Sequence, residues 1–549
     1  MVELKWYDGN RNEAKQCLAC GTTTEMPLIV STTHVIEQRG DVLFYRCPVC
    51  SSLNAEGQFA DFLTSDEGFI DSDRNKYVWD HYLEIGAGID FMVRPIERAG
   101  IITKGRLLDV GCGYGFPLDY WQFVANGVAV GLEPSEYGAR GARELNVKII
   151  PEYLSDQTEL VGQKFDRIIS SEVIEHVPDP KAFLEGIKTY LDQNGVAILT
   201  TPNADFITRH GPLSTLIAAL SPGLHQLLFS KLALEKLLQD VGFSHYVVDV
   251  HEERLIAYAS NEPISFENDD AEIRANYLKY LQSKAVTTDP LDALGAGIRY
   301  RLFKELVNEG RFDEALPIGK EIASSIATKY QFDPLSPAET LAKIRACDTM
   351  QDYTKAAPFF LPCFVFYAAM LTRHGRELGS FTASDQFSCA ADLCAHAQRH
   401  NVIFSQEAGT LYWVSVFEEA FARLVDGDKE RAYQLMERIR NGSEPDERYL
   451  ETCARPRSLV LRATLQSGIA KLQSGEPEWA MAIFRKLMRD IEGDEEAFAL
   501  FSEAKSAWET AVEQSREMLP SQNEKVKNPD KKFRKDGLLT SLFKNKRAV

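Results

Sequence analysis

"LLDVGCGYGFPLDY", residues 107–120, decides the fold of the central part of the chain. An apolar run ends at Val110 and is followed by three alternate glycines, Gly111, Gly113 and Gly115. Glycine tolerates backbone conformations and close approaches that other residues cannot adopt, so this spacing predicts a loop that a ligand approaches closely. We therefore expect a buried strand, a ligand-binding loop and a helix, in that order.

Strands and helices alternate from residue 105 to about 260. Segments 135–146 ("SEYGARGARELN") and 179–194 ("DPKAFLEGIKTYLDQN") have the apolar spacing of helices. The predicted strands are Arg106–Val110, Val128–Leu132, Val147–Ile150, Phe165–Ser170 and Val196–Thr200. This alternation predicts an α/β fold of the Rossmann-like kind, with a parallel sheet covered by helices on both faces.

Two acidic residues narrow the ligand class. Glu133 follows the second strand, 24 residues after Asp109, and a carboxylate at that place suits the two hydroxyls of a ribose. Phe116 stands where a dinucleotide-binding loop would have its third glycine. Asp109, directly before the glycines, suits a ligand with a cationic amino-acid part rather than a pyrophosphate.

Several stretches resemble, in order and spacing, the motifs of class I S-adenosylmethionine-dependent methyltransferases. They are "LLDVGCGYG" (107–115), "GLEPS" (131–135), "FDRIISSEVIEHVPDP" (165–180), "GVAILTTPN" (195–203) and "LHQLLFSKLALEKLLQDVGF" (224–243), the last resembling members that methylate sugars and other small molecules. The resemblance covers residues 100–260. It implies that Asp109, Gly111 and Gly113 hold the methionine part of S-adenosylmethionine (SAM), Glu133 the ribose, and that Glu172 closes the pocket near the methyl group.

Two histidines are candidate catalytic bases. A sugar hydroxyl has a high pKa, so its methylation usually needs a general base worth about 10²–10⁴-fold in rate. His176 follows the fourth strand at the carboxyl edge of the sheet, where ligands bind, and His225 lies in the segment expected to cover the acceptor. A structural role for His176 stays open, His210 is a weaker candidate, and Glu172 and Glu175 are expected to serve the cofactor or a solvated turn.

Four cysteines near the N-terminus predict a metal site. Cys17, Cys20, Cys47 and Cys50 form two C-x-x-C pairs, a spacing that lets each tight turn present two sulfurs to a tetrahedral zinc ion. The segments 26–35 and 41–47 between and beside them alternate like strands, which predicts a structural zinc ribbon. Unpaired core cysteines or a redox pair are the alternatives.

Residues from about 270 onward are expected to be helical. Three stretches place a glycine (Gly310, Gly427 or Gly475) five residues before an alanine (Ala315, Ala432 or Ala480), with apolar residues at helical intervals after it. This form predicts the turn and second helix of a helical hairpin and resembles tetratricopeptide-type repeats, although the spacings of 117 and 48 residues differ from their period. A generic helical bundle is the alternative.

Charge and composition exclude some classes. With 61 Lys and Arg against 80 Asp and Glu, the net charge of −19 argues against a nucleic-acid partner. No secretory signal is evident at the N-terminus, and the apolar run 356–371 is broken by prolines, so we expect a cytoplasmic protein. The segment 525–549 carries nine basic and two acidic residues, which suits peripheral contact with the inner face of a membrane, or a solvated tail.

We therefore expect five segments and one leading function. The segments are a zinc ribbon at 1–55, a helical linker or lid at 56–104, a methyltransferase domain at 105–265, a repeat-like helical domain at 270–520 and a basic amphipathic tail at 521–549. The leading function is SAM-dependent methylation of a sugar hydroxyl in bacterial surface-polysaccharide synthesis, with the helical domain available to protein partners. Alternatives are a zinc-ribbon RNA methyltransferase, a sugar C-methyltransferase, and a non-catalytic interaction protein.

Overall fold

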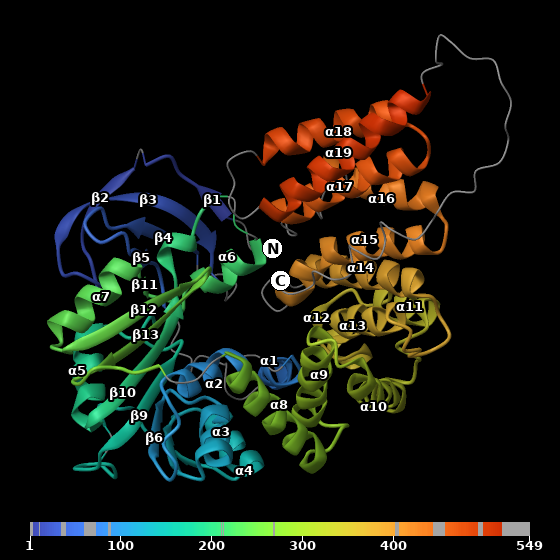
Figure 1. Cartoon of the computed structure of the whole chain (residues 1–549). Helices are drawn as coiled ribbons and strands as arrows, with labels where there is room; N and C mark the ends of the chain where they lie inside the picture. Colours follow the sequence, from blue (N-terminus) through green and yellow to red (C-terminus); the bar gives the residue numbers. More distant parts are fainter. Residues whose placement is uncertain are drawn as a thin grey trace, which may run out of the picture. The chain divides into compact units, whose positions relative to one another are not determined.

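The structure, a computed structural model, describes most of the chain (Figure 1). The described residues are 4–9, 11–34, 40–59, 73–85, 89–156, 158–209, 211, 213–266, 270–400, 406–442, 456–491 and 498–518. His210 and the predicted basic tail at 521–549 lie outside them. The chain divides into two compact units, Met1–Ala463 and Thr464–Val549, and each is described by itself.

Strands are confined to the first 260 residues of the described chain. They are β1 (Leu4–Trp6), β2 (Asn12–Gln16), β3 (Thr23–Thr33), β4 (Asp41–Arg46), β5 (Leu53–Glu56), β6 (Arg106–Val110), β7 (Val128–Leu132), β8 (Lys148–Ile150), β9 (Phe165–Ser171), β10 (Leu191–Pro202), β11 (Leu227–Leu228), β12 (His245–His251) and β13 (Arg254–Ser260).

Helices accompany the central strands and make up the rest of the described chain. They are α1 (Asp73–Glu84), α2 (Ile89–Arg98), α3 (Phe116–Ala125), α4 (Glu136–Leu145), α5 (Pro180–Tyr190), α6 (Leu213–Leu220), α7 (Lys231–Asp240), α8 (Asp270–Thr287), α9 (Ala293–Asn308), α10 (Phe312–Tyr330), α11 (Pro337–Arg345), α12 (Met350–Ala356), α13 (Leu361–Arg373), α14 (Ala383–His400), α15 (Gln406–Val425), α16 (Lys429–Asn441), α17 (Arg457–Gln473), α18 (Pro477–Asp490) and α19 (Phe498–Met518).

Seven strands form the central sheet, in the order β12-β13-β10-β9-β6-β7-β8. The five predicted strands are present and pair in parallel, the third beginning at Lys148. The sheet as a whole is mixed, because two further strands that were not predicted extend it and β13 runs antiparallel to both β10 and β12. A short reversal after β12 allows this pairing, whereas each parallel neighbour needs a longer crossover.

Helices cover both faces of this sheet, as the alternation predicts. Along β6, Leu107 packs in one buried cluster with Trp121 of α3, whereas Leu108 packs in another with Leu184 of α5 and Leu234 of α7. Successive strand residues point to opposite faces, so both faces are buried and the strand reads as a continuous apolar run. Figure 1 shows α5 and α7 on one side of the sheet and α3 on the other.

A second, antiparallel sheet contains the cysteine-rich segment. Its order is β1-β3-β4-β5-β11, with β2 also paired to β3. Leu53–Glu56, at the end of the predicted ribbon segment 1–55, is the strand β5, and the last strand, β11, comes from residues 227–228, outside that segment. The cysteine-rich sheet is therefore completed by a segment of the central α/β region.

The region after residue 270 is helical, and the three glycine-to-alanine stretches have the expected local form. Gly310, Gly427 and Gly475 have positive φ and each stands just after the end of a helix. The matching alanines are fully buried in the next helix. A left-handed glycine ends a helix because it allows the chain to turn back at low cost. The likeness to tetratricopeptide repeats is not confirmed.

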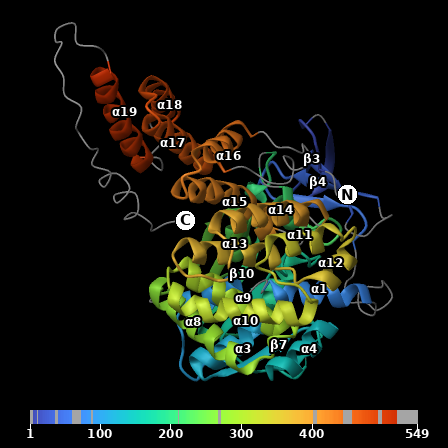
Figure 2. The same ribbon diagram turned by 90° about the vertical axis from the view of Figure 1, so that its right-hand side faces the viewer.

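The helix α8 packs on α2 and α3, and α9 packs on α1 (Figure 2). Tyr280 and Lys284 of α8 both donate hydrogen bonds to the buried Asp119 of α3, at 2.8 Å and 2.6 Å. A single buried apolar cluster runs from the central sheet through α8 and α9 to α13. None of the described helices is long and apolar enough to cross a membrane.

Candidate functional site

The glycine loop lies between β6 and α3, as predicted. Gly111 has φ +75°, and a Cβ there would lie only 2.4 Å from Val173 Cγ2. Gly115, at φ +89°, precedes the first turn of α3, so the loop ends at a helix N-terminus. The loop therefore needs glycine for its backbone conformation as well as for the approach of a neighbouring segment.

Asp109 is a buried carboxyl group without a partner. Its side chain is almost fully buried on β6, and its Oδ2 atom has no hydrogen bond. Burial, together with the nearby charge of Glu133, raises the pKa of Asp109 well above its usual range. Burying a carboxylate alone is costly, so this position favours a bound group that donates hydrogen bonds or carries positive charge.

Glu133 lies beside the same loop, at the end of β7. Its Oε2 accepts a hydrogen bond from the N–H of Gly113 at 3.1 Å, and its Oε1 accepts one from the N–H of Ser135 at 3.0 Å. Ser135 in turn caps α4 through the N–H of Gly138. The carboxylate is thus held in one orientation, and each oxygen keeps a lone pair for a ligand hydroxyl.

Glu172 follows β9 at the carboxyl edge of the sheet, with the left-handed backbone angle φ +56°. Its Oε1 accepts hydrogen bonds from Thr200 Oγ1 at 2.9 Å and from Arg254 Nε at 3.2 Å. The Arg254 guanidinium lies 3.9 Å from the ring centre of Phe91 on α2. A non-glycine residue held at positive φ is often found at functional sites, where the surrounding contacts offset the strain.

The two candidate bases, predicted separately, lie side by side. The ring centres of His176 and His225 are 4.6 Å apart in an edge-to-face arrangement. His176 Nδ1 lies 3.1 Å from the carbonyl of Leu224, and His225 Nδ1 lies 2.8 Å from the carbonyl of Ala219. A carbonyl only accepts, so each Nδ1 carries the proton and each Nε2 has a free lone pair.

Burial keeps both imidazoles neutral. It lowers the pKa of His176, and burial together with the neighbouring His176 ring lowers the pKa of His225 well below its usual value. His176 is half-buried and His225 is buried. His176 is therefore the more accessible of two bases that are unprotonated near neutral pH.

Glu175 belongs to the same group. It is fully buried, which contradicts the expected solvated turn, while the expected role with the cofactor stays a prediction. Thr201 Oγ1 donates to its Oε2 at 3.0 Å, while its Oε1 has no hydrogen-bond partner and lies 3.8 Å from His225 Nε2. Burial raises the pKa of Glu175 well above its usual range.

Glu175, His176 and His225 together could also hold a divalent cation. One potential ligand atom from each lies within 4.8 Å of the other two. Two imidazoles and one carboxylate are a common ligand set, and ligating histidines usually donate their other N–H to a carbonyl, as both do here. The cluster can therefore act on a hydroxyl either as a base or through a bound ion.

The four N-terminal cysteines converge as the spacing predicts. Their sulfurs form one group, with Cys17 Sγ 3.6 Å from Cys50 Sγ and Cys20 Sγ 3.8 Å from Cys47 Sγ. The hydrogen bond with Cys50 lowers the pKa of the Cys17 thiol. Four sulfurs at these separations suit a closed tetrahedral zinc site.

Sequence reasoning missed three features of the site. These are Arg254 on Glu172, the burial of Glu175, and an aromatic wall in which Tyr137 lies 5.1 Å from Tyr114 and 5.8 Å from Trp79 between ring centres. Tyr137 also lies over the glycine loop, 3.6 Å from where a Cβ of Gly113 would be. A single arginine at the start of β13 has no periodic signal that marks it in advance.

Residues 79–247 match the family model of a methyltransferase domain. The match includes the glycine loop, Glu133, Glu172, Glu175 and both histidines. The chain thus contains a Rossmann-like methyltransferase domain with a mixed sheet, followed by a large helical region.

Relatives of the methyltransferase domain share only part of their length with the chain. The ubiquinone biosynthesis O-methyltransferase of Histophilus somni is 32% identical over 119 residues, which are 20% of this chain and 50% of that protein. The enzyme of the same name from Pasteurella multocida is 31% identical over 121 residues, again 20% and 50%. The chain spans about half the length of these relatives.

One solved structure similar to the chain is an O-methyltransferase family protein from Burkholderia thailandensis. It has 12% identity and a TM-score of 0.31, and the alignment covers 37% of this chain and 65% of that one.

Proposed function

We propose that this protein transfers a methyl group from SAM to a hydroxyl group of a small molecule. The observation that carries the proposal is the buried, unpartnered Asp109 carboxyl beside a glycine loop, with Glu133 held on the other side of that loop. Asp109, Gly111 and Gly113 would hold the cationic amino-acid part, Glu133 the ribose hydroxyls, and Tyr137 the rim of the loop. When bound, SAM supplies a methyl group on a positively charged sulfur.

The residues beyond this pocket suit a hydroxyl acceptor. As the acceptor oxygen bonds to the methyl carbon, the carbon–sulfur bond breaks and the hydroxyl proton must leave. We assign that proton to His176 Nε2, because this nitrogen is unprotonated and the ring is half-buried. The carbonyl of Leu224, which accepts the Nδ1 proton, and the nearby charge of Glu172 stabilise the charge that the imidazole gains, and His225 lies beside the His176 ring. Glu172, fixed by Thr200 and Arg254, closes the pocket.

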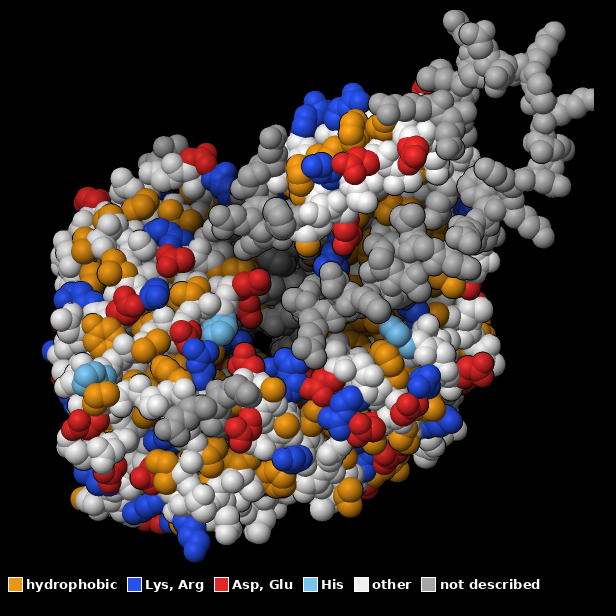
Figure 3. Space-filling model, in the orientation of Figure 1, with side chains coloured by type: hydrophobic (Ala, Val, Ile, Leu, Met, Phe, Trp, Pro, Cys, Tyr) orange, Lys and Arg blue, Asp and Glu red, His pale blue; other side chains and the backbone are white. Residues whose placement is uncertain are grey.

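We propose a sugar hydroxyl, in bacterial surface-polysaccharide synthesis, as the leading acceptor. A phenolic hydroxyl is the second candidate, because the relatives are named for O-methylation in ubiquinone biosynthesis. A nucleic-acid acceptor is disfavoured by the net charge of −19, and Lys and Arg are interspersed with Asp and Glu on the face shown in Figure 3. A sugar C-methyltransferase is a further alternative.

The deciding experiment adds the purified protein and methyl-labelled SAM to a host lysate. Lipid-linked glycans, nucleotide sugars, isoprenoid quinones, RNA and protein are then separated and counted. Label in the lipid-linked glycans or in the nucleotide sugars supports a sugar acceptor, and label in the quinone fraction supports a phenolic acceptor. Label in RNA, or in no fraction despite measured SAM binding, overturns a small-molecule hydroxyl acceptor.

A matched pair of variants tests the assigned base. His176→Ala is expected to lower the methylation rate by about 10²–10⁴-fold, the usual contribution of a general base. His225→Ala is expected to have a smaller effect, because that histidine faces Glu175 and lies behind His176. A chelator titration distinguishes a histidine base from a metal ion bound at the cluster. Only the metal-dependent enzyme would lose activity with the chelator and regain it when Mg²⁺ or Mn²⁺ is added. A larger loss in His225→Ala than in His176→Ala would reverse the assignment.

We also propose functions for the flanking segments. Cys17, Cys20, Cys47 and Cys50 would bind one structural Zn²⁺ ion. The helical region would bind protein partners, and the basic segment 521–549 would attach a cytoplasmic enzyme to an anionic membrane. Flotation with vesicles of phosphatidylglycerol, compared with neutral vesicles, tests the last point, and equal recovery with both would refute it.

A further inference from the structure

Residues 224–230 form the joint that connects the cysteine-rich sheet to the loop that carries Glu175 and His176, called the catalytic loop below. Here β11 pairs antiparallel with β5, Leu227 opposite Asn54 and Leu228 opposite Leu53. His225 and Gln226 come directly before β11 along the chain. The segment that presents His225 therefore leads directly into a strand of the cysteine-rich sheet.

Gln226 is hydrogen-bonded in two directions at this joint. Its carbonyl accepts the N–H of Ala55 on β5 at 3.0 Å. Its own N–H donates to the carbonyl of Glu175 at 2.9 Å, and its side-chain Nε2 donates to the carbonyl of His176 at 2.9 Å. One residue thus connects β5 to the backbone of two members of the catalytic cluster.

The other end of the joint reaches the cysteine cluster. Ser230 donates its hydroxyl to the carbonyl of Cys50, and its N–H donates to Ser52 Oγ at 3.1 Å. Asn54 of β5 donates from Nδ2 to Cys17 Sγ at 3.4 Å and accepts the N–H of Leu18 at 2.8 Å. β5, the strand that Gln226 contacts, is therefore hydrogen-bonded to Cys17, a predicted metal ligand, and to the turn that carries it.

A small displacement of the His176 ring is expected to lower the rate of methyl transfer. His176 has to present Nε2 to an acceptor hydroxyl within hydrogen-bond distance, and a misplacement of about 1 Å can lower a rate by about 10²-fold. Residues that hydrogen-bond the backbone next to a catalytic side chain fix that geometry. These hydrogen bonds form a series from Cys17 through Asn54, Ala55 and Gln226 to Glu175 and His176. The series includes no residue of the glycine loop.

We propose that Gln226 is a positioning residue that makes the placement of Glu175 and His176 depend on the metal in the cysteine cluster. This inference rests on the proposed function of the site. With the metal bound, β5 is rigid and Gln226 holds residues 175–177 in the catalytic arrangement. Without it, β5 and β11 loosen and residues 175–177 lose their position, while Val173 stays packed on Gly111 and SAM binding at the glycine loop is unchanged.

The test compares Gln226→Leu with a matched control, Gln239→Leu, on the exposed face of α7. Leucine keeps the size and the backbone bonds but removes the donor to His176. We expect the initial rate of label transfer from SAM into the lysate acceptor fraction to fall about 30- to 100-fold in Gln226→Leu. The Kd for S-adenosylhomocysteine, measured by calorimetry, should change less than twofold, and the control should match the wild type.

Hydrogen exchange supplies a readout that does not depend on activity. Amides of 175–177 and 224–230 should exchange faster in Gln226→Leu, and also in wild-type protein stripped of metal by a chelator, while 107–115 stays unchanged. In the stripped variant the two effects should not add, because they act through one joint. Fully additive effects, or metal removal that leaves 175–177 unchanged, would overturn the proposal even if Gln226→Leu is unstable.

The outcomes separate this inference from the proposed function. Wild-type protein that fails to bind S-adenosylhomocysteine contradicts the proposed function itself. Wild-type protein that binds it and transfers label, beside a Gln226→Leu variant with an unchanged rate, contradicts only the positioning role. A rate loss with an equal loss of cofactor affinity would show general unfolding of the domain and would also overturn the positioning role.

Discussion

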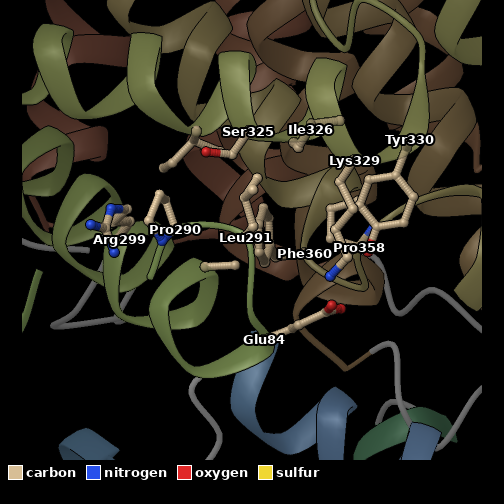
Figure 4. Close-up of a pocket in the computed structure, with 12 residues that line it drawn as sticks. Glu84, Pro290, Leu291, Arg299, Ser325, Ile326, Lys329, Tyr330, Pro358 and Phe360 are labelled. Carbon is tan, nitrogen blue, oxygen red and sulfur yellow. The ribbon is translucent and has the colours of Figure 1, made fainter. Parts of the chain in front are cut away.

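Glu84 offers a quantitative test of how the helical region holds the methyltransferase domain. It is the last residue of α1 and is buried, and its Oε2 accepts the N–H of Phe359, which precedes α13, at 2.8 Å. Burial raises the pKa of Glu84 to about 7. Figure 4 shows the Glu84 carboxyl and Lys329 at the same end of a pocket lined by Tyr330, Pro358 and Phe360.

The expected energy follows from that pKa. The difference between the ordinary value of 4.5 and about 7 corresponds to about 3 kcal/mol, at about 1.4 kcal/mol per pH unit. Since the pKa is raised on folding, the contribution of Glu84 to stability is complete below pH 4.5 and is lost as the pH rises to 7. Above pH 7 the folded protein has to bury a charged carboxylate.

The perturbation is Glu84→Gln, which is neutral at every pH and still accepts the N–H of Phe359. Urea unfolding followed by tryptophan fluorescence should show the variant about 3 kcal/mol more stable than the wild type at pH 8, and equal to it near pH 4.5. The control is Glu185→Gln, on the exposed surface of α5. A stability difference for Glu84→Gln that is the same at both pH values would refute the reasoning.

Three further predictions concern the two ligand sites. Gly111→Ala is expected to weaken S-adenosylhomocysteine binding at least about 10-fold, because its Cβ would lie 2.4 Å from Val173 Cγ2. Gly162→Ala, at a similar positive φ in open space, is the control for backbone strain. Equal losses of binding in both variants would contradict the steric argument. Glu133→Ala is expected to raise the calorimetric Kd about 10- to 100-fold through loss of the ribose acceptor, and an unchanged Kd would exclude that role. Cys47→Ser is expected to lower the zinc content from about one equivalent to near zero by mass spectrometry, whereas full retention would rule out a site of four cysteines.

Features of the methyltransferase domain that follow from local pattern could be predicted from the sequence. The strand Arg106–Val110 and the turn at Gly111 are set by residues that are neighbours in the chain, so periodicity and glycine spacing reveal them. The antiparallel strand β13 could not be foreseen in this way. Its direction is decided by pairing with β10, about 60 residues earlier in the sequence.

The sequence indicated which residues belong to the candidate site but not which of them contact one another. His176 and His225 could each be recognised as bases from their place after a strand and in a covering segment, yet their contact joins segments 49 residues apart. β11 is only two residues long and carries no periodic signal, so its pairing with β5 was not visible. The N–H groups of Gln226 and Leu227 both donate to the carbonyl of Glu175, a contact between segments about 50 residues apart that the sequence pattern does not reveal.

The shared strand has a consequence for how this protein can be divided. A fragment that begins at residue 79, where the family match starts, would lack β5 and leave β11 as an unpaired sheet edge. Unpaired edges with apolar residues such as Leu227 and Leu228 promote aggregation. Recombination or grafting that exchanges the catalytic part alone should thus yield insoluble protein, so the two sheets have to be inherited and transplanted as one piece.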